Sequence, residues 1–171
     1  MILILNATNR PNNKTQVIAR YYAQTLQDKG ETVRYYSLED LPVSALHHDY
    51  REESGEVKAW TEEYLLPATR LVVVSPEYNG SFPGVLKLLI DCIPPRHFAG
   101  KKAALVGVAS GRAGNLRGLD HLTSILHHLG VEVLSKKSYV SLVLNLIQNT
   151  ELVDETTKQV LDRQMDALLT F

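Results

Sequence analysis

The stretch "RLVVVSPEYNGSFPGVLKLLID", residues 70–91, decides the fold. It opens with an apolar, β-branched run at residues 71–74, which is typical of a strand that is buried on both faces. A helical pattern starts at Pro83, a residue that suits the first turn of a helix. Between them lie polar turn formers, with no aliphatic side chain. A buried strand that passes through a polar loop into a helix is the repeating unit of a parallel α/β sheet.

The same unit recurs on both sides of this stretch. We expect strands at residues 1–5, 32–36, 71–74, 103–108 and 131–134, the last of which can extend to residue 140. We expect helices at residues 15–29, 51–65, 83–90, 115–129 and 154–169. In the last helix, the apolar side chains expected to face inward are Val160, Leu161, Leu168 and Leu169.

The strands are apolar throughout rather than alternating, so helices must cover both faces of the sheet. This predicts an α/β fold, a flavodoxin-like three-layer sandwich whose five-stranded parallel sheet has the order 2-1-3-4-5. With 171 residues, we expect a single domain over residues 1–171.

Composition excludes several classes of protein. There are 18 basic and 19 acidic residues, so the net charge of -1 gives no reason to expect a nucleic-acid partner. No apolar run has the length of a membrane span, so we expect no membrane partner. The one cysteine, Cys92, is expected to be a small core residue, and its isolation favours a reducing compartment. We therefore expect a cytoplasmic protein.

Three loops can reach the place where strand order reverses, which is where open parallel sheets bind ligands. They are residues 6–14, 75–82 and 109–116. The first leads into a helix N-terminus, whose unpaired N–H groups and partial positive charge favour a phosphate. Its hydroxyl, amide and cationic side chains are those of Thr8, Arg10, Asn13, Lys14 and Thr15. The alternative is an ordinary asparagine-rich helix cap with solvated basic residues.

Other chemistries match the sequence poorly. Residues 8–15, "TNRPNNKT", have the length of a P-loop, but Thr8 and Asn13 replace its glycines, and we reject nucleoside triphosphate hydrolysis. The glycines of residues 109–118 lack the spacing of a dinucleotide fingerprint, and a flexible connection is the alternative interpretation there. No nucleophile elbow is present, and the six histidines form no metal-binding motif, so we expect no metal.

Residues 76–91 resemble the NADPH-dependent FMN reductase family, which carries a P-E-Y-N-x-S-x-P-G-x-L-K-N-A-I-D pattern after its third strand. The matching residues are Pro76, Glu77, Tyr78, Asn79, Ser81, Pro83, Gly84, Leu86, Lys87, Ile90 and Asp91. The family's phosphate loop, G-S-x-R-x-x-S-x-N, is matched at Thr8 and Arg10, whereas Ala7, Asn13 and Thr15 depart from it. In the third loop, Asn115 replaces the last glycine of the family's S-x-G-x-x-G-G.

The resemblance implies an FMN cofactor and NADPH as electron donor. It places the FMN phosphate on the helix N-terminus with Thr8, Arg10, Asn13, Lys14 and Thr15. It places the isoalloxazine ring against Pro76, Glu77, Tyr78, Asn79 and Gly80, with Ser110, Gly111 and Arg112 at its other edge. No catalytic side chain is required, because the flavin carries the chemistry. The implied acceptor is a quinone, azo compound, metal oxyanion or free flavin, and the implied assembly is a homodimer or homotetramer.

Two alternatives belong to other functional classes. One is a flavodoxin-like electron carrier without a hydride donor, although flavodoxins are usually more acidic than this chain. The other is a fold that has lost its cofactor and acts through protein contacts. The sequence leaves NADPH and NADH open as donors, although Arg112 and Arg117 would favour a 2′-phosphate.

Overall fold

The computed structural model describes residues 1–46 and 55–171. Its main sheet is parallel and has the order β2-β1-β3-β4-β5, which confirms the predicted order. The strands are β1 (Ile2–Asn6), β2 (Val33–Ser37), β3 (Arg70–Pro76), β4 (Lys102–Val108), β5 (Glu132–Val133) and β6 (Ser138–Val140), of which β6 also pairs with β4.

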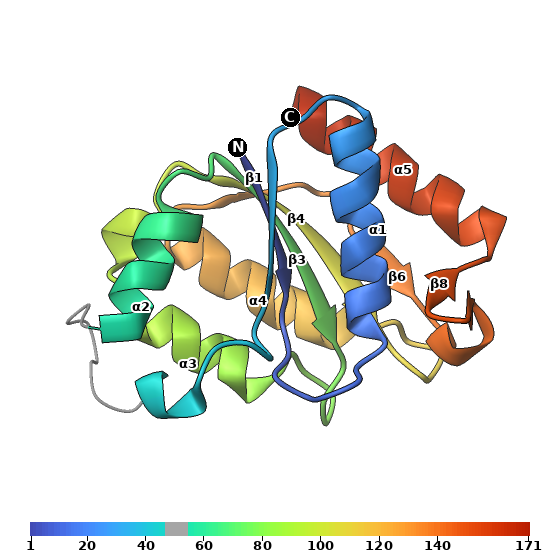
Figure 1. Ribbon diagram of the computed structural model, residues 1–171, viewed down its shortest axis with the longest axis horizontal. Coiled ribbons are helices and arrows are strands. Elements are labelled where there is room, and N and C mark those ends of the chain that lie inside the picture. Colours follow the sequence, from blue (N-terminus) through green and yellow to red (C-terminus); the bar gives the residue numbers. More distant parts are fainter. Residues whose placement is uncertain (47–54) are drawn as a thin grey trace.

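Helices cover both faces of this sheet, as expected for strands buried on both sides. They are α1 (Thr15–Asp28), α2 (Gly55–Trp60), α3 (Gly84–Cys92), α4 (Leu116–His128) and α5 (Glu155–Thr170). In Figure 1, α1 and α5 lie to the right of the sheet and α2 and α3 to the left. Alternate residues of each strand face opposite layers: Leu3 and Leu71 join the core under α2, α3 and α4, whereas Ile4 and Val72 join the core under α1 and α5.

The expected fifth strand is interrupted. Val133 pairs with Ala103 and Ser138 pairs with Val106, so β4 advances three residues while its partner advances five. The excess chain bulges out of the ladder at three residues that are not buried, Ser135, Lys136 and Lys137. The expected strand at residues 131–134 is therefore present as β5, and its possible extension to residue 140 is a separate strand, β6.

A glutamine from α5 fills the gap that this bulge leaves. The Gln164 amide donates to the carbonyls of Leu105, at 3.0 Å, and Lys136, at 2.7 Å. Its carbonyl oxygen accepts a hydrogen bond of 2.6 Å from the Tyr22 hydroxyl of α1. Both side chains are fully buried, and burial raises the pKa of the Tyr22 hydroxyl, which stays protonated and able to donate.

Several local features differ from the predictions. Residues 51–54 of the expected second helix lie outside the described residues, and α2 runs into a π-helical turn, Thr61–Leu65. Val160 does not face inward but is 38% exposed. An unpredicted antiparallel pair, β7 (Ile147–Gln148) and β8 (Glu151–Leu152), precedes α5, and 3-10 turns occupy Val43–Leu46, Pro95–His97 and Val143–Asn145. Cys92 is buried, as expected.

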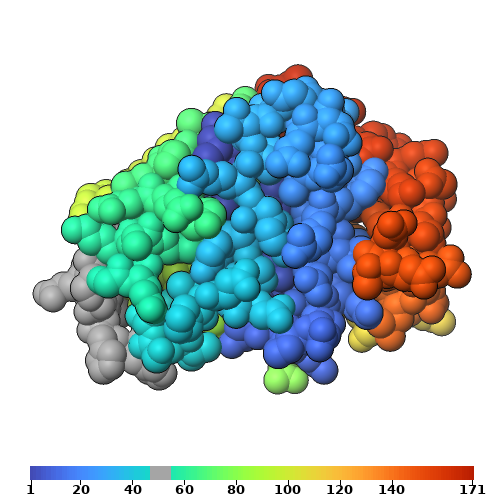
Figure 2. All heavy atoms as spheres, in the orientation of Figure 1, coloured from blue at the N-terminus to red at the C-terminus, as the bar shows by residue number. Residues whose placement is uncertain are grey.

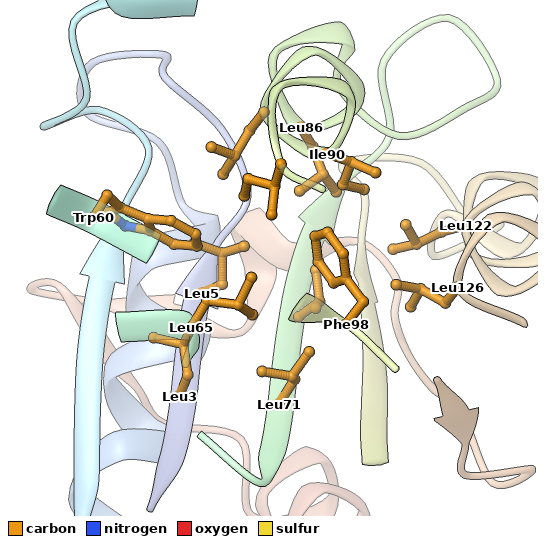
Figure 3. Close-up of a pocket in the computed structure, with 13 residues that line it drawn as sticks. Leu3, Leu5, Trp60, Leu65, Leu71, Leu86, Ile90, Phe98, Leu122 and Leu126 are labelled. Carbon is orange, nitrogen blue, oxygen red and sulfur yellow. The ribbon is translucent and has the colours of Figure 1, made fainter. Parts of the chain in front are cut away.

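The core under α2, α3 and α4 contains a small hollow, shown in Figure 3. Leu5, Trp60, Phe98 and Leu122 are among the side chains that point into its space of about 30 Å³. This is roughly the volume of one water molecule, but a buried water needs polar partners and the lining is apolar. The hollow is therefore a packing defect of the core rather than a binding site.

None of the helices in the described portion of the chain combines the length and apolar character that crossing a membrane requires.

We predict that Tyr22→Phe lowers the free energy of unfolding by about 1–3 kcal/mol, because it leaves a buried Gln164 oxygen without a donor. Tyr21→Phe on the same helix is the matched control. The Tyr21 hydroxyl donates to Asp162 at a part-buried position, where water can replace it, so the loss should be smaller. Urea denaturation measures both changes, and equal losses would contradict the role given to the buried pair.

Candidate active site

Three loops leave the carboxyl edge of the sheet next to one another. Because the strands are parallel, the loops after β1, β3 and β4 emerge at one edge, the lower edge in Figure 1. In Figure 2, the light-green tip of the loop after β3 protrudes there beside the blue loop that precedes α1.

The loops surround a hollow of about 460 Å³, called here the main hollow. Its lining residues are Arg10, Pro11, Asn12, Asn13, Lys14, Thr15, Pro76, Tyr78, Val108, Ser110, Val143 and Leu144. The structure thus brings together the predicted site residues Arg10, Asn13, Lys14, Thr15, Pro76, Tyr78 and Ser110.

Asn13 fixes the N-terminus of α1 at this hollow. Its side-chain oxygen accepts from the Gln16 backbone N–H at 2.9 Å, and its amide donates to the Arg10 carbonyl at 2.8 Å. Asn13 is therefore a helix cap that also closes the loop, as the capping alternative proposed. Because both polar ends of the Asn13 side chain bond to the backbone, this side chain holds the loop in shape, and other groups must bind a ligand.

Those other groups are backbone donors and cations. The N–H groups of Lys14 and Thr15 have no acceptor in the part of the chain that the structure describes. Arg10 and Lys14 are exposed at the hollow and form no ion pair with any described carboxylate. A helix N-terminus with free N–H groups and two unpaired cations is suited to an anion such as a phosphate.

Thr8 lies beneath the loop and does not line the main hollow. It is fully buried, and its hydroxyl shares a hydrogen bond of 2.7 Å with the Tyr78 hydroxyl. The same oxygen accepts from the Arg10 N–H at 3.2 Å. Thr8 therefore ties the first loop to the second, so it supports the site from outside the lining.

The second loop is a tight hairpin. Tyr78 and Ser81 exchange two backbone hydrogen bonds of 2.8 and 3.1 Å, and the residues between them, Asn79 and Gly80, have φ angles of 51° and 77°. Two consecutive positive φ angles define a type I′ turn, for which Asn-Gly is the preferred sequence. Asn79 and Gly80 form the tip of this turn and do not line the main hollow.

Asn115 joins the second loop to the third. It is fully buried with φ 65°, and its amide donates to the carbonyls of Ser75, at 3.1 Å, and Pro76, at 2.9 Å. Its backbone N–H donates to the Glu77 carboxylate at 3.2 Å. From the sequence, Asn115 was noted only because it replaces a glycine of the family's third loop. Asparagine, like glycine, tolerates a left-handed backbone, but its side-chain amide also donates hydrogen bonds. This difference between the two residue types is the signal that could have identified its structural role.

A second hollow of about 430 Å³, called here the arginine hollow, lies on the other side of these loops. It is lined by Glu77, Arg112, Ala113, Leu116, Arg117, Tyr139 and Ser141. Two predicted site residues, Glu77 and Arg112, therefore face this hollow instead of the main one. Gly111 lines neither.

Within residues 1–46 and 55–171, no group of three or more histidine, cysteine, aspartate or glutamate side chains is arranged to hold a metal ion.

Comparison with known proteins gives a consistent result. The sequence model of the family described as NADPH-dependent FMN reductase matches residues 1–143. A quinone reductase of Escherichia coli K12 is 30% identical over 168 residues, which are 95% of this chain and 85% of that protein. An NAD(P)H-dependent FMN reductase of Pseudomonas aeruginosa is 34% identical over 114 residues, which are 62% of this chain and 60% of that protein.

Solved structures share the fold. FerB, a flavoenzyme NAD(P)H:(acceptor) oxidoreductase from Paracoccus denitrificans, superposes with a TM-score of 0.79. The match covers 99% of this chain and 94% of that one at 23% identity.

We predict that Asn115→Gly costs about 1–3 kcal/mol of unfolding free energy, because glycine keeps the left-handed backbone but leaves buried carbonyls without a donor. Asn115→Ala should cost about 1–2 kcal/mol more, because alanine also strains a positive φ. Urea unfolding of the three proteins should give the order parent, glycine, alanine. A glycine variant as stable as the parent would show that the amide bonds contribute nothing.

Proposed function

The chain belongs to the NADPH-dependent FMN reductase family, and we propose that it oxidises NAD(P)H and reduces a small-molecule acceptor, with FMN held in the main hollow. The observation that carries this proposal lies at the start of α1, where N–H groups and cations have no partner among the described residues, beside walls built from the loops after β3 and β4. Residues 1–171 would act as one flavodoxin-like FMN-binding domain.

The residues present fit the phosphate of FMN. The N–H groups of Lys14 and Thr15 supply donors, and Arg10 and Lys14 supply positive charge at an exposed rim. Asn13 and Thr8 hold the loop in shape, the first as a cap and the second through Tyr78. Because this geometry is set before a ligand arrives, little ordering would be required on binding.

The walls fit a flat aromatic ring system. Pro76, Tyr78, Val108 and Val143 present apolar surface to the main hollow, and the Ser110 hydroxyl is at its edge. Of the other predicted residues, we also propose contact by Asn79, Gly80 and Gly111, whereas Glu77 and Arg112 face the arginine hollow. The chemistry that FMN supplies when bound is hydride acceptance from a nicotinamide and electron release to a second substrate. The chain's own role is to bind, orient and enclose it.

The acceptor we propose is a quinone, an azo compound, a metal oxyanion or a free flavin. Support comes from relatives whose names are quinone reductase and NADPH azoreductase. We propose a cytoplasmic homodimer or homotetramer. Two exposed apolar side chains after β6, Leu142 and Leu144, support an assembly.

Adding FMN to the purified protein and titrating it with NADPH under anaerobic conditions tests the function. Bleaching of the flavin absorbance, and its return when a quinone is added, is the expected result. Bound FMN that NADPH does not bleach would indicate an electron carrier instead. A protein that binds no FMN would indicate a fold that acts through protein contacts.

We predict that Arg10→Ala weakens FMN binding about ten- to hundredfold, the effect of losing one hydrogen bond to a charged group. Riboflavin lacks the phosphate and should bind parent and variant about equally. Fluorescence quenching measures both ligands. Arg96→Ala is the control, because Arg96 precedes β4 at the opposite edge of the sheet. Equal loss of riboflavin and FMN would mean that Arg10 acts on the fold.

A further inference from the structure

The arginine hollow contains two cations without acidic partners. Arg112 and Arg117 are exposed, and neither forms an ion pair with a carboxylate among the residues described. Five other cations of the described residues do form ion pairs, among them Lys87 with Asp91 and Lys137 with Asp120, both at 2.7 Å. The two guanidinium groups outnumber the one carboxylate that lines this hollow, that of Glu77, and so favour an anionic ligand.

The acid in this hollow is already engaged. The Glu77 carboxylate accepts the Asn115 backbone N–H at the base of the loop. The Ser141 hydroxyl donates to the Arg112 carbonyl at 2.7 Å and so fixes the backbone that carries this arginine. The hollow therefore has a defined floor, and because two arginines and one carboxylate line it, its net charge is positive.

The arginine hollow and the main hollow share a wall. Pro76 lines the main hollow and the next residue, Glu77, lines the arginine hollow. On the loop after β4, Ser110 lines the main hollow and Arg112 lines the arginine hollow. A long ligand with one end in the main hollow can therefore lay its other end in the arginine hollow.

The remaining lining suits a nucleoside. Tyr139 and Leu116 are 40% and 48% exposed, and both line this hollow. An aromatic ring and an aliphatic side chain offer the flat apolar surface on which a purine can stack. Stacking surface beside two arginines matches a phosphorylated nucleoside.

We propose that the arginine hollow binds the phosphorylated adenosine end of the hydride donor, and that Arg112 and Arg117 select NADPH over NADH by contact with the 2′-phosphate. The inference rests on the proposed function, since it concerns the donor of that reaction. Guanidinium groups bind phosphate oxygens through paired, charge-assisted hydrogen bonds. The 2′-hydroxyl of NADH carries no charge for them to bind.

Calorimetry with nucleotide fragments tests this on the FMN-loaded protein. The parent should bind 2′,5′-ADP more tightly than 5′-AMP. Arg112→Gln and Arg117→Gln should each weaken 2′,5′-ADP about ten- to hundredfold and change 5′-AMP less than about twofold. Arg96→Gln, at the opposite edge of the sheet, should change neither. In turnover, each hollow variant should raise the KM for NADPH and leave that for NADH unchanged.

Equal affinity of the parent for the two fragments would overturn the proposal, as would equal losses of both fragments in the two hollow variants. FMN affinity, measured separately by fluorescence quenching, should stay at the parent value in both. If NADPH fails to bleach bound FMN, the proposed function is wrong, whereas bleaching without 2′,5′-ADP selectivity refutes only the role of the arginine hollow.

Discussion

The side chain of Asn115 is the constraint on which both hollows depend. Its amide reaches across from the loop after β4 to two carbonyls at the end of β3, in a place without access to water. Because Pro76 and Glu77 line different hollows, this one amide sets the position of both walls. Its side-chain oxygen has no partner in the described residues, so the site keeps one unsatisfied buried acceptor.

Around Asn115, the backbones of neighbouring segments also approach one another closely at two glycines, Gly107 and Gly118. A Cβ atom at Gly118 would lie 2.0 Å from the Asn115 side-chain oxygen and 2.7 Å from the Phe82 nitrogen. A Cβ atom at Gly107 would lie 2.0 Å from the Gly114 carbonyl oxygen. Only glycine fits at these two positions, and the start of α4 can therefore press against the hairpin after β3. The loops are polar and irregular, but the packing beneath them is as tight as in a core.

The fold was predictable because three of its strands, β1, β3 and β4, are buried on both faces. Apolar runs without alternation indicate a parallel sheet, and the helical segments between them leave few topologies. The predictions that differ from the structure concern features that depend on contacts between residues far apart in the sequence. The interruption between β5 and β6 is stabilised by Gln164, which no local pattern near residue 135 can show. Val160 lies one position from the inward stripe of Leu161, Met165 and Leu168, and a rule based on apolarity cannot separate them.

The candidate site was predictable in place but only partly in role. Topology brings the loops after β1, β3 and β4 to one edge, whatever their side chains do. It does not reveal that Thr8 is buried against Tyr78 or that Asn13 caps α1. Topology also does not show that Pro76 and Glu77 line different hollows, since neighbouring residues on one loop can face different ways.

The position of β1 has a consequence for how the chain folds. This strand is wholly buried and pairs with β2 on one side and β3 on the other. During synthesis it emerges before α1, β2 and α2, so its β3 edge waits unpaired until those elements have been made. A short apolar strand with a free edge is a template for pairing with other chains. Parallel sheets close slowly because their partners are distant in sequence. A strand from the interior of the finished sheet is thus open to pairing with other chains while the protein is being made.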